Sequence, residues 1–196
     1  MKERIKYMIA LVFSISIAIV VIQELAYPTL LQYDRLAHMM NRFAYTKATL
    51  IIFVTLSSWL LYLQIHRRKW SMLYIYLFYS VYLFLLFVVL FTKATAYHQV
   101  SWNLFDFISW DKKTLIEAVL NVGYFIPLGV LYAVKANYVE LVVIALLTIV
   151  GIETIQYVFY IGTFALSDIL LNFIGCVIGY ELLKFLQRKM QSPQRR

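Results

Sequence analysis

Cysteine, charge and catalytic motifs are all scarce in this chain. One cysteine, Cys176, occurs in 196 residues, so no disulfide and no cysteine-based metal site can form within one chain. The three histidines lie far apart along the sequence, and we predict neither a metal site nor a cofactor. The sequence contains no HExxH zinc motif, no G-x-S-x-G nucleophile motif and no glycine-rich phosphate loop. These absences leave no recognisable catalytic class.

Charged residues make up only 14% of the chain, whereas 63% of the residues are hydrophobic. Apolar runs of about 20 residues recur throughout, and a helix of that length crosses a bilayer. Six ranges qualify: 5–26, 44–65, 70–91, 115–134, 139–159 and 165–186. The connections are too short to form a soluble domain. The sequence therefore predicts an all-α fold, a polytopic membrane helical bundle with about six transmembrane helices.

Lysine and arginine are unevenly divided between the two sides that these spans define. Twelve of the 18 fall on the side of the membrane that carries both termini, and six fall on the opposite side. Because cytoplasmic loops carry an excess of these residues, we predict that both termini are cytoplasmic. This bias and attraction to anionic headgroups explain the net charge of +8, so we predict a cell-membrane protein that contacts lipids and no nucleic acid. No cleavage site follows the first span, which we expect to stay as an anchor.

Three loops would then face outward, at residues 27–43, 92–114 and 160–163. The middle loop interleaves aromatic with polar residues, among them Trp102, Asn103 and Trp110. Such a segment suits the headgroup zone, where rings are buried and polar tips stay wet. It is consistent both with an ordinary aromatic belt and with a ligand platform, and the segment alone does not decide between them.

Acidic and amide residues interrupt the last three spans at similar depths. They form pairs spaced three or four residues apart, so each helix presents its pair on one face. The pairs are Glu117 with Asn121, Glu153 with Gln156, and Asp168 with Asn172. Ionisable groups inside a bilayer cost about 2.5 to 3.5 kcal/mol each and normally face the bundle interior or water. We predict one polar cluster in a cavity open to the outside. With Trp102, Asn103 and Trp110, these six residues are the ligand-binding candidates.

Small residues in the same region predict close helix packing. Gly175 and Gly179 form a small-xxx-small face in the sixth span, which lets a neighbouring backbone approach. Pro127, followed by Gly129, is expected to kink the fourth span and to free a backbone carbonyl toward the cluster. We treat these four residues as structural.

These residues also resemble the signature of the VanZ-like family. Residues 121–129 are similar to the family's Asn-x-x-x-Phe-x-Pro-x-Gly element, and residues 153–156 to its Glu-x-x-Gln element. Residues 168–175 resemble its Asp-x-x-x-Asn-x-x-Gly element, and residues 103–107 resemble its Asn-Leu-x-Pro-Phe loop. The elements keep their order and spacing over about residues 70–186. The chain departs from the pattern at Asp106, where a proline is usual, and at Gly162, where many members carry an arginine.

The resemblance implies a membrane factor of the Gram-positive cell envelope. Such proteins reduce susceptibility to the glycopeptide antibiotic teicoplanin and related lipoglycopeptides by lowering drug binding at the cell surface, without modifying the peptidoglycan precursor. The resemblance also divides the chain into a pair of spans at 1–69, a VanZ-like domain at 70–186 and a basic cytoplasmic tail at 187–196.

From the residues we add the hypothesis that the polar cleft binds a lipoglycopeptide or a lipid-linked envelope precursor. Trp102 and Trp110 would contact apolar parts, and Glu153 and Asp168 the polar head. A membrane-embedded enzyme is an alternative, because two buried carboxylates can supply a general acid and a general base, although no nucleophile is evident. A flippase is another, although the two halves show no matching polar pattern. The third alternative is a purely structural role for the cluster. The sequence does not reveal the oligomeric state.

Overall fold

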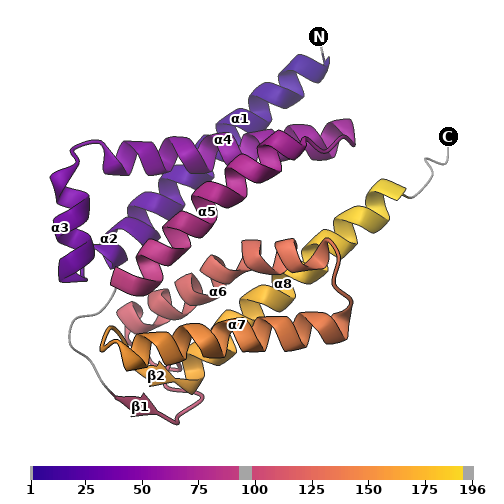
Figure 1. The fold of residues 1–196 in the computed structure, drawn as a ribbon. Coiled ribbons are helices and arrows are strands. Elements are labelled where there is room, and N and C mark those ends of the chain that lie inside the picture. The colour runs from indigo at the N-terminus through magenta and orange to yellow at the C-terminus, as the bar shows by residue number, and fades with distance from the viewer. Residues whose placement is uncertain (1, 93–98, 192–196) are drawn as a thin grey trace. The chain divides into compact units, whose positions relative to one another are not determined.

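The computed structural model describes residues 2–92 and 99–191 (Figure 1). Within this part of the chain, six helices are long and apolar enough to cross a membrane, which confirms the predicted helical bundle. They cover Glu3–Leu30, Thr46–Arg67, Met72–Thr92, Lys112–Ala133, Tyr138–Val158 and Leu166–Lys189. Parts of the predicted outer loop 92–114 and basic tail 187–196 fall on residues 93–98 and 192–196, outside the described residues. The orientation of the termini stays a prediction.

The chain divides into two compact units, Met1–Val89 and Leu90–Arg196, here called unit 1 and unit 2. The elements of unit 1 are α1 (Lys2–Val20), the π-helix η1 (Val21–Ala26), α2 (Tyr27–Leu30), α3 (Asp34–Arg42), α4 (Thr46–Arg67) and most of α5 (Met72–Thr92). Unit 2 contains β1 (Val100–Ser101), α6 (Lys112–Ala133), α7 (Tyr138–Val158), β2 (Phe164–Ala165) and α8 (Leu166–Gln191). This boundary reflects packing. The divisions predicted at residues 69 and 186 reflect the family resemblance and stay predictions.

The first span changes from α to π geometry before it ends. At the end of η1 the Tyr27 N–H donates to the Ile22 carbonyl, five residues back. Pro28 follows directly, and because proline lacks an N–H group, the Glu24 carbonyl has no donor four residues ahead. The wider turn accommodates this mismatch, and the helix continues through α2 to Leu30.

A short amphipathic helix, α3, occupies part of the predicted outer loop 27–43. Leu36 and Met40, four residues apart, bury one face of α3 against Leu30. Asp34 in the first turn and Arg42 in the last turn complement the helix dipole. The sequence prediction missed this helix, because nine residues of mixed polarity are too few to register as a span.

α4 and α5 form a hairpin whose turn is held by Gln64. The Ser71 N–H donates to Gln64 Oε1 over 2.8 Å, and the Lys69 N–H donates to the Gln64 carbonyl over 3.1 Å. Arg68 ends α4 in a left-handed backbone conformation with φ of 52°. The two helices are therefore joined by a tight, hydrogen-bonded turn.

In unit 2, capping residues fix where α6 and α7 begin. Asp111 accepts a hydrogen bond of 3.0 Å from the Thr114 N–H at the start of α6. Asn137 and Glu140 form a reciprocal capping box at the start of α7. α6 continues past Pro127 as one helix, so the kink expected there does not interrupt it.

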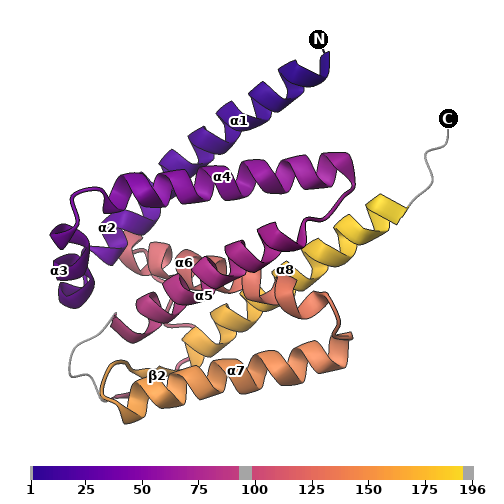
Figure 2. The same cartoon turned by 45° about the horizontal axis from the view of Figure 1, so that its top comes forward.

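α6 and α8 lie side by side with their backbones in contact (Figure 1 and Figure 2). A Cβ at Gly175 would overlap the Val122 carbonyl oxygen, and a Cβ at Gly179 would overlap the backbone of α6 one turn further on. From the other side, a Cβ at Gly129 would overlap the Cys176 carbonyl. Only glycine permits so close an approach. This contact sets the register in which the polar residues of the two helices meet.

The two short strands pair in parallel at one end of unit 2 (Figure 1). Val100 lies opposite Phe164, and Ser101 lies opposite Ala165. The Phe164 N–H also donates to the Gln99 carbonyl over 2.9 Å. The pairing attaches the described part of the predicted outer loop, residues 99–111 and here called the aromatic loop, to the α7–α8 turn. It was not predicted, because strands of two residues have no periodicity in the sequence.

Candidate functional site

Polar residues of α6, α7 and α8 gather at the end of unit 2 that carries the strand pair. The link between α6 and α8 is a hydrogen bond of 2.9 Å from Asn121 Nδ2 to Asp168 Oδ1. Asn121 lies nearly two turns before Pro127 in α6, and Asp168 lies in the first turn of α8. Both side chains are half-buried. The bond therefore joins two of the motif elements that the sequence places 47 residues apart.

Glu153 holds the second strand in place. Its side chain is only 2% exposed, near the end of α7, and its Oε2 accepts a hydrogen bond of 3.4 Å from the Ala165 N–H. Ala165 belongs to β2, which pairs with β1 at the start of the aromatic loop. Glu153 therefore connects the helical core to the aromatic loop through the backbone of β2.

Gln156 ties α7 to the end of α5. Its Nε2 donates to the Leu90 carbonyl over 2.6 Å, and the side chain is buried. Gly162 packs directly on it, since a Cβ at Gly162 would lie 3.1 Å from the Gln156 Cβ. A side chain at residue 162, such as the arginine of the family pattern, would therefore require Gln156 to move by a few tenths of an ångström. The departure at Gly162 is thus matched by the packing of its neighbour.

The remaining members of the predicted cluster lie at different depths in the protein. Asn172 is 3% exposed, and within the described residues its Oδ1 accepts no hydrogen bond. Ser167, which was not singled out as a ligand-binding candidate, is also buried at 3%. Glu117, one turn before Asn121 in α6, is half-buried.

The cluster thus has two tiers. Glu153, Gln156 and Asn172 form an inner tier inside the packed helices, where the first two bond to backbone atoms. Asn121 and Asp168 form an outer tier with Glu117, and all three are partly exposed. The inner tier is buried and the outer tier is partly exposed. The cavity open to the outside stays a prediction.

The aromatic loop begins beside this cluster. The Trp102 ring lies 6.5 Å, centroid to centroid, from the ring of Phe164 in β2. Asn103 Oδ1 accepts a hydrogen bond from the Phe105 N–H over 3.0 Å and closes a local turn. Asp106, at the position of the expected proline, accepts a hydrogen bond of 3.3 Å from the Ser101 hydroxyl.

The loop ends at Trp110, which is fully exposed, and at Asp111, which caps α6. The Thr114 N–H and hydroxyl both donate to the Asp111 carboxylate over 3.0 Å. These hydrogen bonds stabilise the charged form and lower the pKa of Asp111 below its ordinary value. The loop is therefore anchored at both ends, by β1 and by the α6 cap.

A family model decides what kind of protein carries this site. The model of the VanZ/LLP1 family matches residues 73–187. The chain belongs to the VanZ/LLP1 family. The resemblance seen in the sequence is thereby confirmed, and the matched range includes α6, α7, both strands and most of α8. Neither a curated protein nor a solved structure matches the chain.

The family match places the polar cluster inside the VanZ/LLP1 region and leaves α1 to α4 outside it. Sequence reasoning found the side chains of the cluster but missed their backbone partners, the Ala165 N–H and the Leu90 carbonyl. Backbone groups carry no signal in a sequence, so only the folded chain reveals them. Within the described residues, no three His, Cys, Asp or Glu side chains converge on a possible metal position.

Proposed function

We propose that this membrane protein of the VanZ/LLP1 family reduces susceptibility to teicoplanin-like lipoglycopeptides by lowering drug binding at the cell surface. The observation that supports this most is the Asn121–Asp168 hydrogen bond. It gathers two motif elements of the family at one end of unit 2, beside an aromatic loop with exposed rings. Polar and apolar side chains thus lie next to each other, as the binding of an amphiphilic ligand requires.

In this proposal the two tiers have different tasks. Asp168, Asn121 and Glu117 contact the polar part of the ligand, because they are the partly exposed members of the cluster. Trp102 and Trp110 contact its apolar part or the surrounding acyl chains.

The inner tier positions these groups. Glu153 holds β2, and Gln156 holds the end of α5. Asn103 shapes the turn that follows Trp102. The ligand is a lipoglycopeptide anchored in the outer leaflet of the membrane, or a lipid-linked envelope precursor in that leaflet.

The test compares wild type, Asp168→Asn and Glu181→Gln at matched membrane abundance in a drug-sensitive Gram-positive host. Glu181 is the control, because it is an exposed acid on the same helix, away from the cluster. Susceptibility to teicoplanin and vancomycin is measured together with the binding of fluorescent teicoplanin to intact cells. We expect wild type and Glu181→Gln to lower teicoplanin binding and Asp168→Asn to lose the effect.

Two results would contradict the proposal. If wild type leaves teicoplanin binding unchanged, the drug is not the ligand, and handling of a lipid-linked envelope component by an enzyme or flippase becomes the better explanation. If Asp168→Asn protects as well as wild type, the function does not reside in the polar cluster.

A further inference from the structure

Unit 1 concentrates positive charge where α1 begins and α4 ends. Five exposed cationic side chains lie on these two helix ends and the turn that follows, and we call this group the basic end: Arg4, Lys6, Arg67, Arg68 and Lys69. Lys6 pairs with a residue of its own helix, and Arg67 contacts a residue of α1 across the α1–α4 contact. The basic end lies outside the region matched by the family model, and nothing proposed above uses it.

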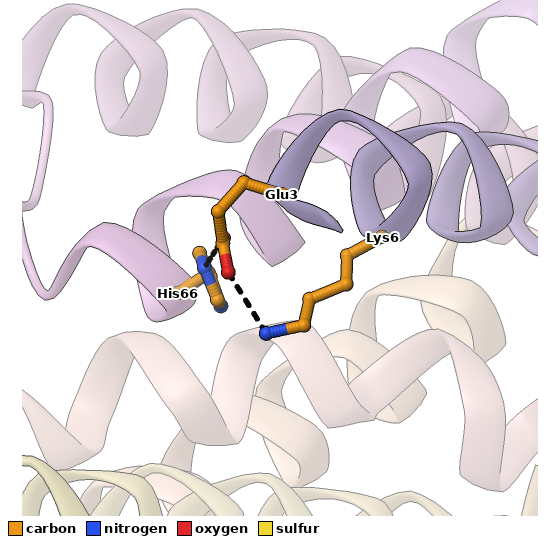
Figure 3. A network of polar contacts seen from close by, with 3 residues as sticks. All are labelled: Glu3, Lys6 and His66. Carbon is orange, nitrogen blue, oxygen red and sulfur yellow. Dashed lines mark hydrogen bonds and ion pairs between the residues drawn. The ribbon is translucent and has the colours of Figure 1, made fainter. Parts of the chain in front are cut away.

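The carboxylate of Glu3 is already engaged inside the basic end (Figure 3). Its Oε1 accepts from Lys6 Nζ over 2.8 Å, and its Oε2 lies 2.8 Å from His66 Nε2 on α4. One anion is thus shared between a lysine of its own helix and a histidine of the neighbouring helix. The other cations around it keep an excess of positive charge at this end.

Tyr7 orders the contact between the two helices. Its carbonyl accepts a hydrogen bond of 3.3 Å from Trp59 Nε1, which fastens α1 to α4. Its ring meets the His66 ring edge-on at 5.5 Å, and His66 stacks in turn on Tyr62 at 5.9 Å. The guanidinium carbon of Arg67 lies 5.8 Å from the centroid of the Tyr7 ring. Arg67 therefore has an aromatic ring beside its guanidinium, a contact that modestly favours this position of the side chain at an exposed site.

An arginine held in this way is suited to bind phosphate. The planar guanidinium directs its N–H donors outward in a fixed fork that matches two phosphate oxygens. Within the described residues, no acceptor is bonded to the side chains of Arg4, Arg67 or Lys69. These donors therefore remain available to an external anion, and the shared Glu3 does not compete for them.

The depth of the basic end identifies the anion. The first span begins at Glu3, and the second span ends at Arg67, so both helix ends meet the bilayer at the level of the headgroups. We propose that the basic end binds the phosphodiester of an anionic phospholipid. Arg67 contacts the phosphate oxygens, and Arg4 and Lys69 complete the site. A soluble phosphate has no acyl chains to hold it at this depth.

The test counts lipids retained by the purified full-length chain in native mass spectrometry. Phosphatidylglycerol and phosphatidylcholine with identical acyl chains are titrated against wild type, Arg67→Gln and Lys135→Gln. Lys135, exposed after α6 in unit 2, controls for the loss of one positive charge elsewhere. We expect wild type to prefer phosphatidylglycerol and Arg67→Gln to bind it about fivefold more weakly, since one basic residue contributes about 1 kcal/mol at an anionic surface. Lys135→Gln should bind as wild type does.

Two further arms make the result decisive. Arg67→Lys keeps the charge but loses the planar fork, so we expect its affinity to fall between those of wild type and Arg67→Gln. Excess inorganic phosphate should not displace the lipid. If Arg67→Gln fails to fold by circular dichroism and size exclusion, Arg4→Gln is the substitute, because no described contact depends on Arg4.

The inference is overturned if wild type shows no preference between the two lipids. It is equally overturned if Arg67→Gln and Lys135→Gln weaken binding to the same degree, because net charge alone would then account for the attraction. Displacement by inorganic phosphate would replace the lipid by a soluble anion and also refute it.

Discussion

At the scale of the residue, four side chains of the polar cluster bond to one another or to the backbone. Asn121 donates to Asp168, Glu153 accepts from the Ala165 N–H, and Gln156 donates to a carbonyl. Such pairing lowers the large penalty for polar groups among apolar helices. The sequence predicted that these residues would meet, because spacing and depth place them on facing surfaces. It did not separate the residues that position the fold from those that face outward.

The role assigned to Glu153 predicts different outcomes for two substitutions. Glu153→Gln keeps an oxygen for the Ala165 N–H, so we expect a stability close to that of wild type. Glu153→Leu leaves this buried donor without its acceptor and should lower the free energy of unfolding by about 1 to 3 kcal/mol. Unfolding in mixed micelles of detergent and SDS measures both. Equal stability of the two variants would mean that the contact with β2 does not contribute.

Asp111 gives a prediction about pH. Because hydrogen bonds from Thr114 lower its pKa, the carboxylate stabilises the start of α6 above the pKa of the unfolded chain. This contribution is lost as the pH falls below about 3.9 and through the lower pKa of the folded state. We expect the Thr114 amide to lose protection from hydrogen exchange over that range.

Asp111→Asn is the matched control, because it retains a capping oxygen and does not titrate. The Asp111→Asn protein should show no change in protection at Thr114 over the same pH range. A change of the same size in both proteins would assign the effect to another group.

At the scale of the element, the spans were predictable and the irregular segments were not. Length and apolar composition alone place the six long helices. The π-turn before Pro28 depends on a local conflict in hydrogen bonding, and α3 depends on the burial of Leu36 and Met40 against residues of other helices. The β1–β2 pair depends on a contact between segments far apart in the chain. Tertiary packing decides each of these, so periodicity does not reveal them.

The contact between α6 and α8 predicts a large difference between two glycines. Gly175→Ala introduces a methyl group that overlaps the Val122 carbonyl oxygen, so the helices must separate, at a cost of about 1 to 3 kcal/mol. Gly151→Ala meets nothing within 4 Å and should stabilise α7 by about 0.5 to 1 kcal/mol. Unfolding in mixed micelles compares the two variants. Equal effects would show that the helices are not held together at Gly175.

At the scale of the whole molecule, the membrane orientation is the prediction on which the proposed function depends. The distribution of lysine and arginine predicts that the aromatic loop lies outside and the α4–α5 turn inside. Cys176 is fully buried, so a thiol reagent should react little with this native cysteine. An impermeant maleimide should label Ser109→Cys on intact cells and label Lys69→Cys only after lysis. The reverse pattern would put the loop inside and remove the basis for binding an external drug.

The close contact between α6 and α8 also constrains how the chain is made. The two helices are separated in sequence by α7, so α6 enters the bilayer before its partner has been synthesised. Until α8 arrives, Asn121 has no Asp168 to accept its hydrogen bond, and the surface around Gly129 has no neighbour. α6 must therefore wait beside the insertion machinery or in contact with lipid while about 40 further residues emerge, at roughly 5 to 20 residues per second. Because α8 is translated after α6 and α7 and completes the buried polar cluster, a chain that ends before α8 is a natural target for membrane quality control.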